Sequence, residues 1–160
     1  MLTMHKRKSN LIGFFLTLLL LIAFIFSPFS ASAQAAKVSK GDQITKYALN
    51  LQGKPFKYGG NTPKGFDASG FTQYVYKNSV KVSLPRTVAD QNKKGETIAQ
   101  KNLQAGDLIF FKTENKKVSF VGIYVGKQKF IAATSKGVKV QSLSTKYWKN
   151  AYYTAKRIVK

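Results

Sequence analysis

The sequence predicts an α+β fold in which N-terminal helices pack on a mostly antiparallel sheet. In the first half of the chain, apolar residues recur at helical spacing. The second half consists of short apolar or alternating segments that are separated by turns. Helices followed by closely spaced hairpins are typical of α+β domains. The length of 160 residues corresponds to about one domain.

Two helices are expected in the first half. One begins after the capping residue Ser39 and ends near Gly53, and its apolar positions are Ile44, Tyr47, Ala48 and Leu51. Asp67 is expected to cap the second helix, which has Phe71, Tyr74, Val75 and Asn78 along one side. A short third segment follows over residues 84–95. In the second half, turn residues separate five expected strands, over residues 108–111, 118–125, 130–134, 138–143 and 152–159.

Residues 1–33 have the three parts of a secretory signal: a basic start, an apolar run over 11–26 and small residues at Ala31–Ala33. The alternative is an uncleaved membrane anchor, but the apolar run is shorter than the roughly 20 residues that span a bilayer. We therefore expect a signal peptide over 1–33, a short arm over 34–43 and one domain over 44–160. The protein is expected to be secreted and associated with the cell wall.

The expected mature chain lacks the residues on which several kinds of catalytic site depend. The chain has no cysteine, and its one histidine, His5, lies in the signal segment. Cys–His and Ser–His catalysis are therefore excluded, as are disulfides and the usual zinc or copper ligands. We expect no cofactor and no bound metal.

The mature chain would carry a net charge of +18, because the signal removes three of the 27 basic residues and none of the six acidic ones. Solubility of a small domain needs a net charge of only about 2 to 8. Nearly all the basic residues are lysines, which suit diffuse attraction to a polyanion better than bidentate recognition. The expected partners of this charge are anionic wall polymers. No nucleic-acid partner is expected, and membrane contact is expected only through the signal segment.

Five stretches of the sequence resemble the NlpC family of papain-like cell-wall peptidases, which includes the p-sixty relatives. They are GKPFKYGG (53–60), GFDASGF (65–71), LPRT (84–87), AGDLIFF (105–111) and VGIYVG (121–126). They occur in the family's order and extend over nearly the whole mature chain. The resemblance implies a papain-like fold of the NlpC type and a groove for cell-wall stem peptides. Peptidoglycan peptides are therefore expected partners, and wall hydrolases are further candidates.

The positions that carry catalysis in this family hold apolar residues here. The resemblance places the family's cysteine at Ala68, its histidine at Phe120 and its third polar residue at Ala132, and a further family tyrosine is Phe56. Alanine offers no nucleophile and phenylalanine accepts no proton, so we assign no catalytic residue. Phe120 is expected to fill the vacated space, and Ala68 to begin a helix that packs against the strand carrying Phe120.

Three polar residues remain at the implied site: Asp67, Ser69 and Arg86. The resemblance implies that Asp67 and Ser69 hold a peptide ligand and that Arg86 meets a carboxylate. The structural alternatives are a helix cap for Asp67, a bond to a first-turn amide for Ser69 and a structural ion pair for Arg86.

The sequence therefore favours a binding protein that resembles a cysteine endopeptidase, although it leaves open whether the protein is an enzyme. The alternative function is a peptidoglycan endopeptidase or amidase with an unorthodox catalytic group. Ser69 with a lysine of lowered pKa is one conceivable group, although nothing in the sequence places a lysine beside it. A membrane-active cationic protein is a third possibility, but the short, core-patterned helices count against it.

Overall fold

The computed structural model describes residues 38–113 and 117–160, so the expected signal segment lies outside the described residues. The helices in the described part are α2 (Lys40–Leu49), α3 (Ala68–Val80), α4 (Val88–Gln91), the short 3-10 helix η1 (Gln100–Asn102) and α5 (Lys146–Ala151). Helix α2 begins at Lys40, within the segment 34–43 that was expected to be an arm. No helix of the described residues is long and apolar enough to cross a membrane.

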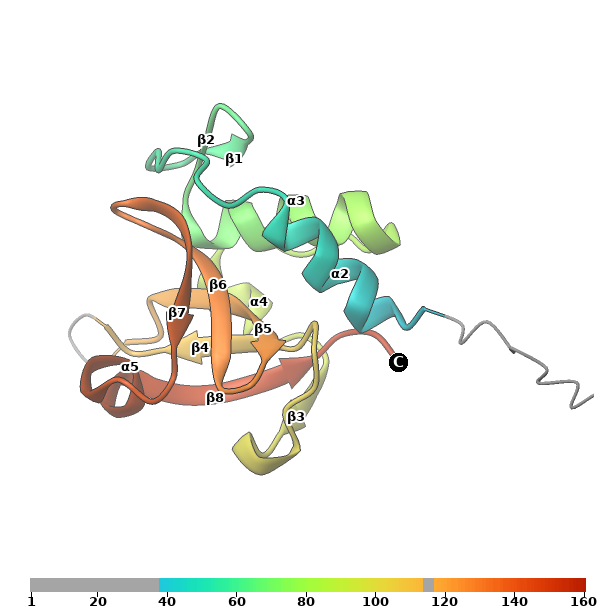
Figure 1. The fold of residues 1–160 in the computed structure, drawn as a ribbon, viewed down its shortest axis with the longest axis vertical. Helices are drawn as coiled ribbons and strands as arrows, with labels where there is room; N and C mark the ends of the chain where they lie inside the picture. Colours follow the sequence, from blue (N-terminus) through green and yellow to red (C-terminus); the bar gives the residue numbers. More distant parts are fainter. Residues whose placement is uncertain (1–37, 114–116) are drawn as a thin grey trace, which may run out of the picture. The chain divides into compact units, whose positions relative to one another are not determined.

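A six-stranded antiparallel sheet with the strand order β3-β8-β4-β5-β6-β7 forms the second half of the domain (Figure 1). Its strands are β3 (Glu96–Ile98), β4 (Leu108–Phe111), β5 (Phe120–Gly126), β6 (Lys129–Thr134), β7 (Gly137–Ser142) and β8 (Tyr152–Arg157). A separate two-stranded hairpin, β1 (Asn61–Thr62) and β2 (Gly65–Phe66), precedes α3. The predicted α+β architecture is confirmed. Helices α2, α3 and α4 precede the main sheet, whereas α5 lies between β7 and β8.

Side-chain caps begin both long helices at the predicted residues. The Ser39 hydroxyl accepts a hydrogen bond from the Asp42 amide at 3.0 Å. The Asp67 carboxylate accepts one from the Gly70 amide at 2.7 Å, so α3 begins at Ala68 as expected. These bonds satisfy backbone donors that have no partner within the first turn of a helix.

The alternation of β5 divides the core into two clusters on opposite faces of the sheet. Val121 and Ile123 face the first cluster, together with Phe71 of α3, whereas Phe120 and Tyr124 face the second. Helices α2 and α3 cover the first face of the sheet. Figure 1 shows α5 at the end of the sheet away from α2. Both faces of the central strands are therefore buried, which explains why β4 consists entirely of apolar residues.

A buried ion pair joins the start of β4 to the end of β8. Asp107 is almost completely buried and accepts hydrogen bonds from Nε and NH2 of Arg157 at 2.9 and 2.8 Å. Nearby, the hydroxyl of buried Tyr76 donates to the Gly106 carbonyl, which ties α3 to the same turn. Burial, with the Asp107 carboxylate adding to it, raises the pKa of Tyr76 well above its ordinary value, so this hydroxyl stays a neutral donor.

Replacing Asp107 with Asn should lower the free energy of unfolding by about 2 to 4 kcal/mol, because it leaves the largely buried guanidinium of Arg157 without its counter-charge. Urea denaturation of the variant measures this change. The matched control is Glu96→Gln, which removes an exposed carboxylate 3.7 Å from Lys160 and should change stability by less than about 0.5 kcal/mol. Equal effects of the two substitutions would contradict a structural role for the Asp107 pair.

Candidate functional site

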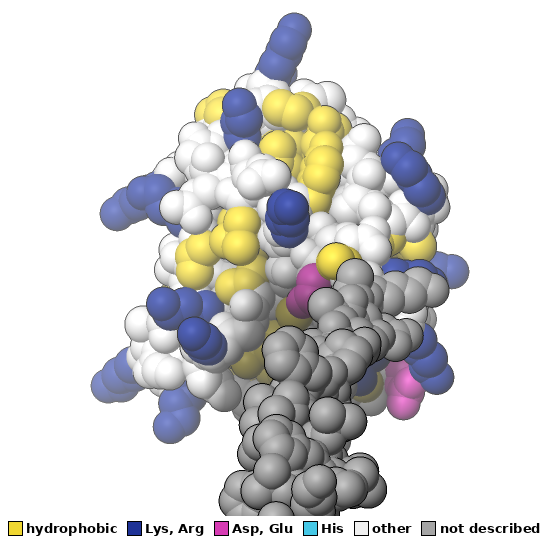
Figure 2. All heavy atoms as spheres, turned by 45° about the vertical axis from the view of Figure 1, so that its right-hand side comes forward, with side chains coloured by type: hydrophobic (Ala, Val, Ile, Leu, Met, Phe, Trp, Pro, Cys, Tyr) yellow, Lys and Arg dark blue, Asp and Glu magenta, His cyan; other side chains and the backbone are white. Residues whose placement is uncertain are grey.

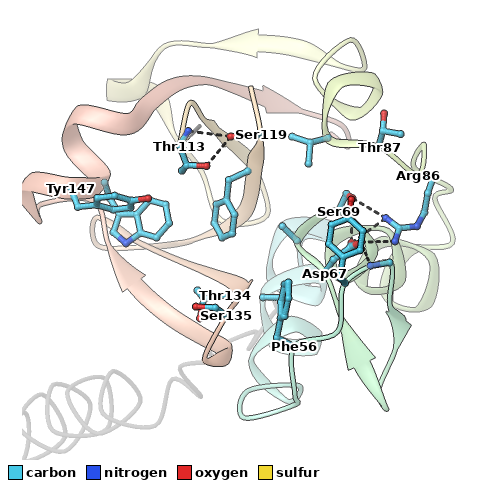
Figure 3. A pocket seen from close by; sticks show the side chains of 17 residues that line it. Phe56, Asp67, Ser69, Arg86, Thr87, Thr113, Ser119, Thr134, Ser135 and Tyr147 are labelled. Atoms are coloured by element: carbon cyan, nitrogen blue, oxygen red, sulfur yellow. Dashed lines mark hydrogen bonds and ion pairs between the residues drawn. The ribbon is translucent and has the colours of Figure 1, made fainter. Parts of the chain in front are cut away.

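A groove of about 1000 Å³ opens where the first turn of α3 faces the sheet (Figure 3). The start of α3 and the segment 86–88 line one side of it. The start of β5, the end of β6 and the first residues of α5 line the other side. A cavity of this size is sufficient for a small ligand or a short peptide.

The structure brings three of the four replaced family positions to this groove. Ala68 lies at the N-terminus of α3, Phe120 at the start of β5 and Phe56 in the loop before β1, and all three line the groove. Ala132 differs, since it is completely buried on β6 among the second core cluster and lies behind the groove wall. Phe120 is partly buried: its ring packs against both core clusters and also forms part of the groove wall.

Asp67, Ser69 and Arg86 form one hydrogen-bonded cluster at one end of the groove (Figure 3). Arg86 NH1 donates to Asp67 Oδ1 at 3.0 Å, and NH2 donates to Oδ2 at 2.6 Å. NH1 also donates to the Ser69 hydroxyl at 2.9 Å. The structural alternatives for Asp67 and Arg86 therefore hold, because Asp67 caps α3 and pairs with Arg86. The same three side chains nevertheless line the groove.

The Arg86 guanidinium keeps hydrogen-bonding capacity beyond this cluster. Three of its five N–H groups donate to Asp67 and Ser69, and the other two form no bond with the described residues. The side chain is 38% exposed and lines the groove. A planar guanidinium with two unused donors suits a carboxylate ligand.

The described lining of the groove offers Ser69 few candidate bases. It contains no lysine, histidine or cysteine, and Asp67 is its one carboxylate. The Ser69 hydroxyl donates a hydrogen bond to Asp67 Oδ1 at 3.4 Å, and the same carboxylate accepts two hydrogen bonds from Arg86. The arrangement is therefore suited to holding a ligand and lacks the parts of a serine–lysine or paired-carboxylate mechanism.

Sequence reasoning missed two aromatic residues that line the groove, Tyr147 and Trp148. Both belong to α5, a short helix that the sequence pattern did not predict. Trp148 stacks on Phe120, with ring centroids 5.1 Å apart. One signal for this helix was present: Thr145, a residue type that favours the N-cap position, precedes it.

Replacing Ala68 with Cys should produce a thiol whose pKa lies below the value of about 8.5 for free cysteine, because a thiolate at the start of α3 is stabilised by the helix dipole. The rate of alkylation by iodoacetamide between pH 6 and pH 10 measures this pKa. The matched control is Ser83→Cys, in an exposed loop beyond the end of α3. Equal midpoints for the two variants would show that this helix terminus does not activate a nucleophile.

Comparisons with known proteins agree with this architecture. A model of the NlpC/P60 family matches residues 53–157. The chain is 39% identical over 136 residues to the murein DD-endopeptidase MepH of Escherichia coli K12, covering 81% of this chain and 50% of MepH. It therefore spans half the length of that relative.

Two solved structures show the same fold. An NlpC/P60 family protein from Bacillus cereus ATCC 10987 superimposes with a TM-score of 0.71 at 29% identity, over 78% of this chain and 42% of that one. RipD of Mycobacterium tuberculosis, described as a non-catalytic NlpC/p60 domain protein adapted to peptidoglycan binding, has a TM-score of 0.65 at 25% identity, over 76% of this chain and 98% of that one. The family model covers well over half of the chain, and the chain belongs to the NlpC/P60 family.

Proposed function

We propose that this protein is secreted, binds peptidoglycan stem peptides in its groove and does not cleave them. The observation that carries the proposal is the groove itself, which has a polar cluster at one end. Ala68 and Phe120 line it at the positions that hold the nucleophile and the base in the family. Support comes from RipD, a member of the same fold that is described as non-catalytic and peptidoglycan-binding. MepH, which acts on murein according to its name, points to the same polymer.

In this proposal, the polar cluster of Asp67, Ser69 and Arg86 holds the peptide. The two unused N–H groups of Arg86 bind a carboxylate of the peptide, and Ser69 adds a hydroxyl next to them. Asp67 keeps the guanidinium in place through its two bonds, so its contribution is mainly to orient Arg86. Stem peptides contain acidic residues and free carboxylates, which fit this donor arrangement.

The lysine-rich surface would add a second, less specific attraction to anionic polymers of the wall. Figure 2 shows Lys and Arg side chains scattered over the visible face and not gathered into one patch. A net charge of +18 on a small exported domain raises its local concentration near polyanions without requiring a defined contact. Wall hydrolases that act on the same polymer remain candidate partners.

The alternative activity is hydrolysis by an unorthodox catalytic group. No observation at the groove favours it, because its described lining offers Ser69 no lysine and leaves Asp67 occupied by Arg86.

A pull-down on purified cell walls separates binding in the groove from the electrostatic attraction of the lysine-rich surface. Exposed charges are screened over about 8 Å at physiological salt and about 3 Å at 1 M, so the electrostatic part of the retention should fall steeply across that range. Walls stripped of teichoic acid should retain less protein at low salt. A smaller, salt-resistant part should remain on both kinds of wall if the groove binds the peptide.

Arg86→Gln should abolish the salt-resistant part. The matched control Lys93→Gln removes the same charge from an exposed side chain outside the groove and should leave that part intact. If both variants behave like the unchanged protein at 1 M salt, Arg86 does not hold the ligand. If no retention survives 1 M salt, the groove contributes nothing measurable and the proposal fails.

A further inference from the structure

Exposed aromatic side chains are concentrated at the groove. Six large apolar residues are exposed in the described part of the chain, and three of them line this one cavity: Phe56 at 40%, Tyr58 at 92% and Tyr147 at 59% exposed. Each leaves an aromatic ring in water in the absence of a ligand. Clustering of such rings at a concave site is typical of surfaces that a ligand covers.

Phe120, Tyr147 and Trp148 form a rigid aromatic wall at the end of the groove away from Arg86 (Figure 3 shows Tyr147 and Arg86 on opposite sides). The Phe120 and Trp148 rings stack at 5.1 Å with an interplanar angle of 29°. Tyr147 packs edge-on against Trp148 at 4.8 Å. The Trp148 indole N–H donates to Gln141 Oε1 at 3.1 Å, which fixes its orientation. The wall therefore exists before any ligand binds.

Hydroxyl groups accompany these rings. Six of the residues that line the groove carry an aliphatic hydroxyl: Ser69, Thr87, Thr113, Ser119, Thr134 and Ser135. Two of them, Thr113 and Ser119, hydrogen-bond to each other at 2.7 Å, so the hydrogen of one of the two hydroxyls remains available to a ligand. The charged residues among the described lining, Asp67 and Arg86, neutralise each other.

Aromatic faces combined with neutral hydroxyls match the chemistry of a pyranose ring. One face of such a ring presents C–H groups that pack on an aromatic surface, while its edge carries hydroxyl and acetamido groups that exchange hydrogen bonds. The hydroxyls of Ser69, Thr87 and Thr134 already donate to acceptors of the protein. An apolar peptide side chain would use the rings but leave the Ser135 hydroxyl and the free hydrogen of the Thr113–Ser119 pair without a partner, which costs free energy once they are desolvated.

We propose that the aromatic wall binds an N-acetylated amino-sugar ring of the glycan strand. This inference rests on the proposed function, since it adds a glycan subsite to the groove in which Arg86 holds the peptide. The wall and the Arg86 cluster lie at opposite ends of the groove, so one ligand carrying both a sugar and a peptide occupies both (Figure 3). The ligand class is therefore a glycopeptide fragment and not a bare peptide.

Trp148 makes the test direct, because it is the one tryptophan of the chain and belongs to the wall. Titration with the trimer of N-acetylglucosamine, which carries no peptide, should change the tryptophan fluorescence saturably. Tyr147→Ala should weaken the affinity about tenfold, the size expected for loss of one aromatic contact, whereas Tyr147→Phe should retain it. Tyr153→Ala is the matched control, because Tyr153 is also exposed but does not line the groove.

A parallel titration with a sugar-free stem peptide separates this inference from the proposed function. The glycan subsite is supported if Tyr147→Ala weakens trimer binding and Tyr153→Ala does not, whether or not the peptide binds. If the peptide binds and the trimer does not, the subsite is refuted while the proposed function stands. Equal losses in the two alanine variants would likewise refute it.

Discussion

The carboxylate of Asp67 is the group on which the geometry of the groove depends. It accepts hydrogen bonds from the backbone amides of Gly59 and Gly70 at 3.1 and 2.7 Å, and two more from the Arg86 guanidinium. One side chain therefore joins the loop before β1, the first turn of α3 and the segment that carries Arg86. Gly70 allows this close approach, because a Cβ at that position would lie 2.1 Å from the Gly60 carbonyl oxygen.

This network explains how the groove can persist with apolar residues at the positions that carry catalysis in the family. Ala68 and Phe120 contribute no hydrogen bond to it, so their identity can change while the carboxylate, the capped helix and the arginine stay in place. Phe120 instead joins the aromatic packing around Trp148. The scaffold and the reactive groups are thus physically separable, and that separation supports a function in binding.

The sequence predicted the parts of the fold that depend on local chemistry. Asp67 identified the start of α3 because a carboxylate satisfies first-turn amides, and the alternation of β5 indicated which of its residues share a face. Helix α5 escaped prediction because its six residues are too few to show a period, and it is held by tertiary contacts of Trp148. The pairing of Arg86 with Asp67 joins residues 19 positions apart, so spacing alone could not distinguish it from ligand binding.

The measurement that tests the central claim most directly is incubation of the purified protein with peptidoglycan fragments, followed by mass spectrometry of the products. A murein endopeptidase treated in parallel shows that the fragments are cleavable. The account predicts that this protein leaves every stem peptide intact while it still co-sediments with the polymer. Release of new peptide ends by the unchanged protein would contradict it and would show that the groove contains a catalytic group other than a cysteine–histidine pair.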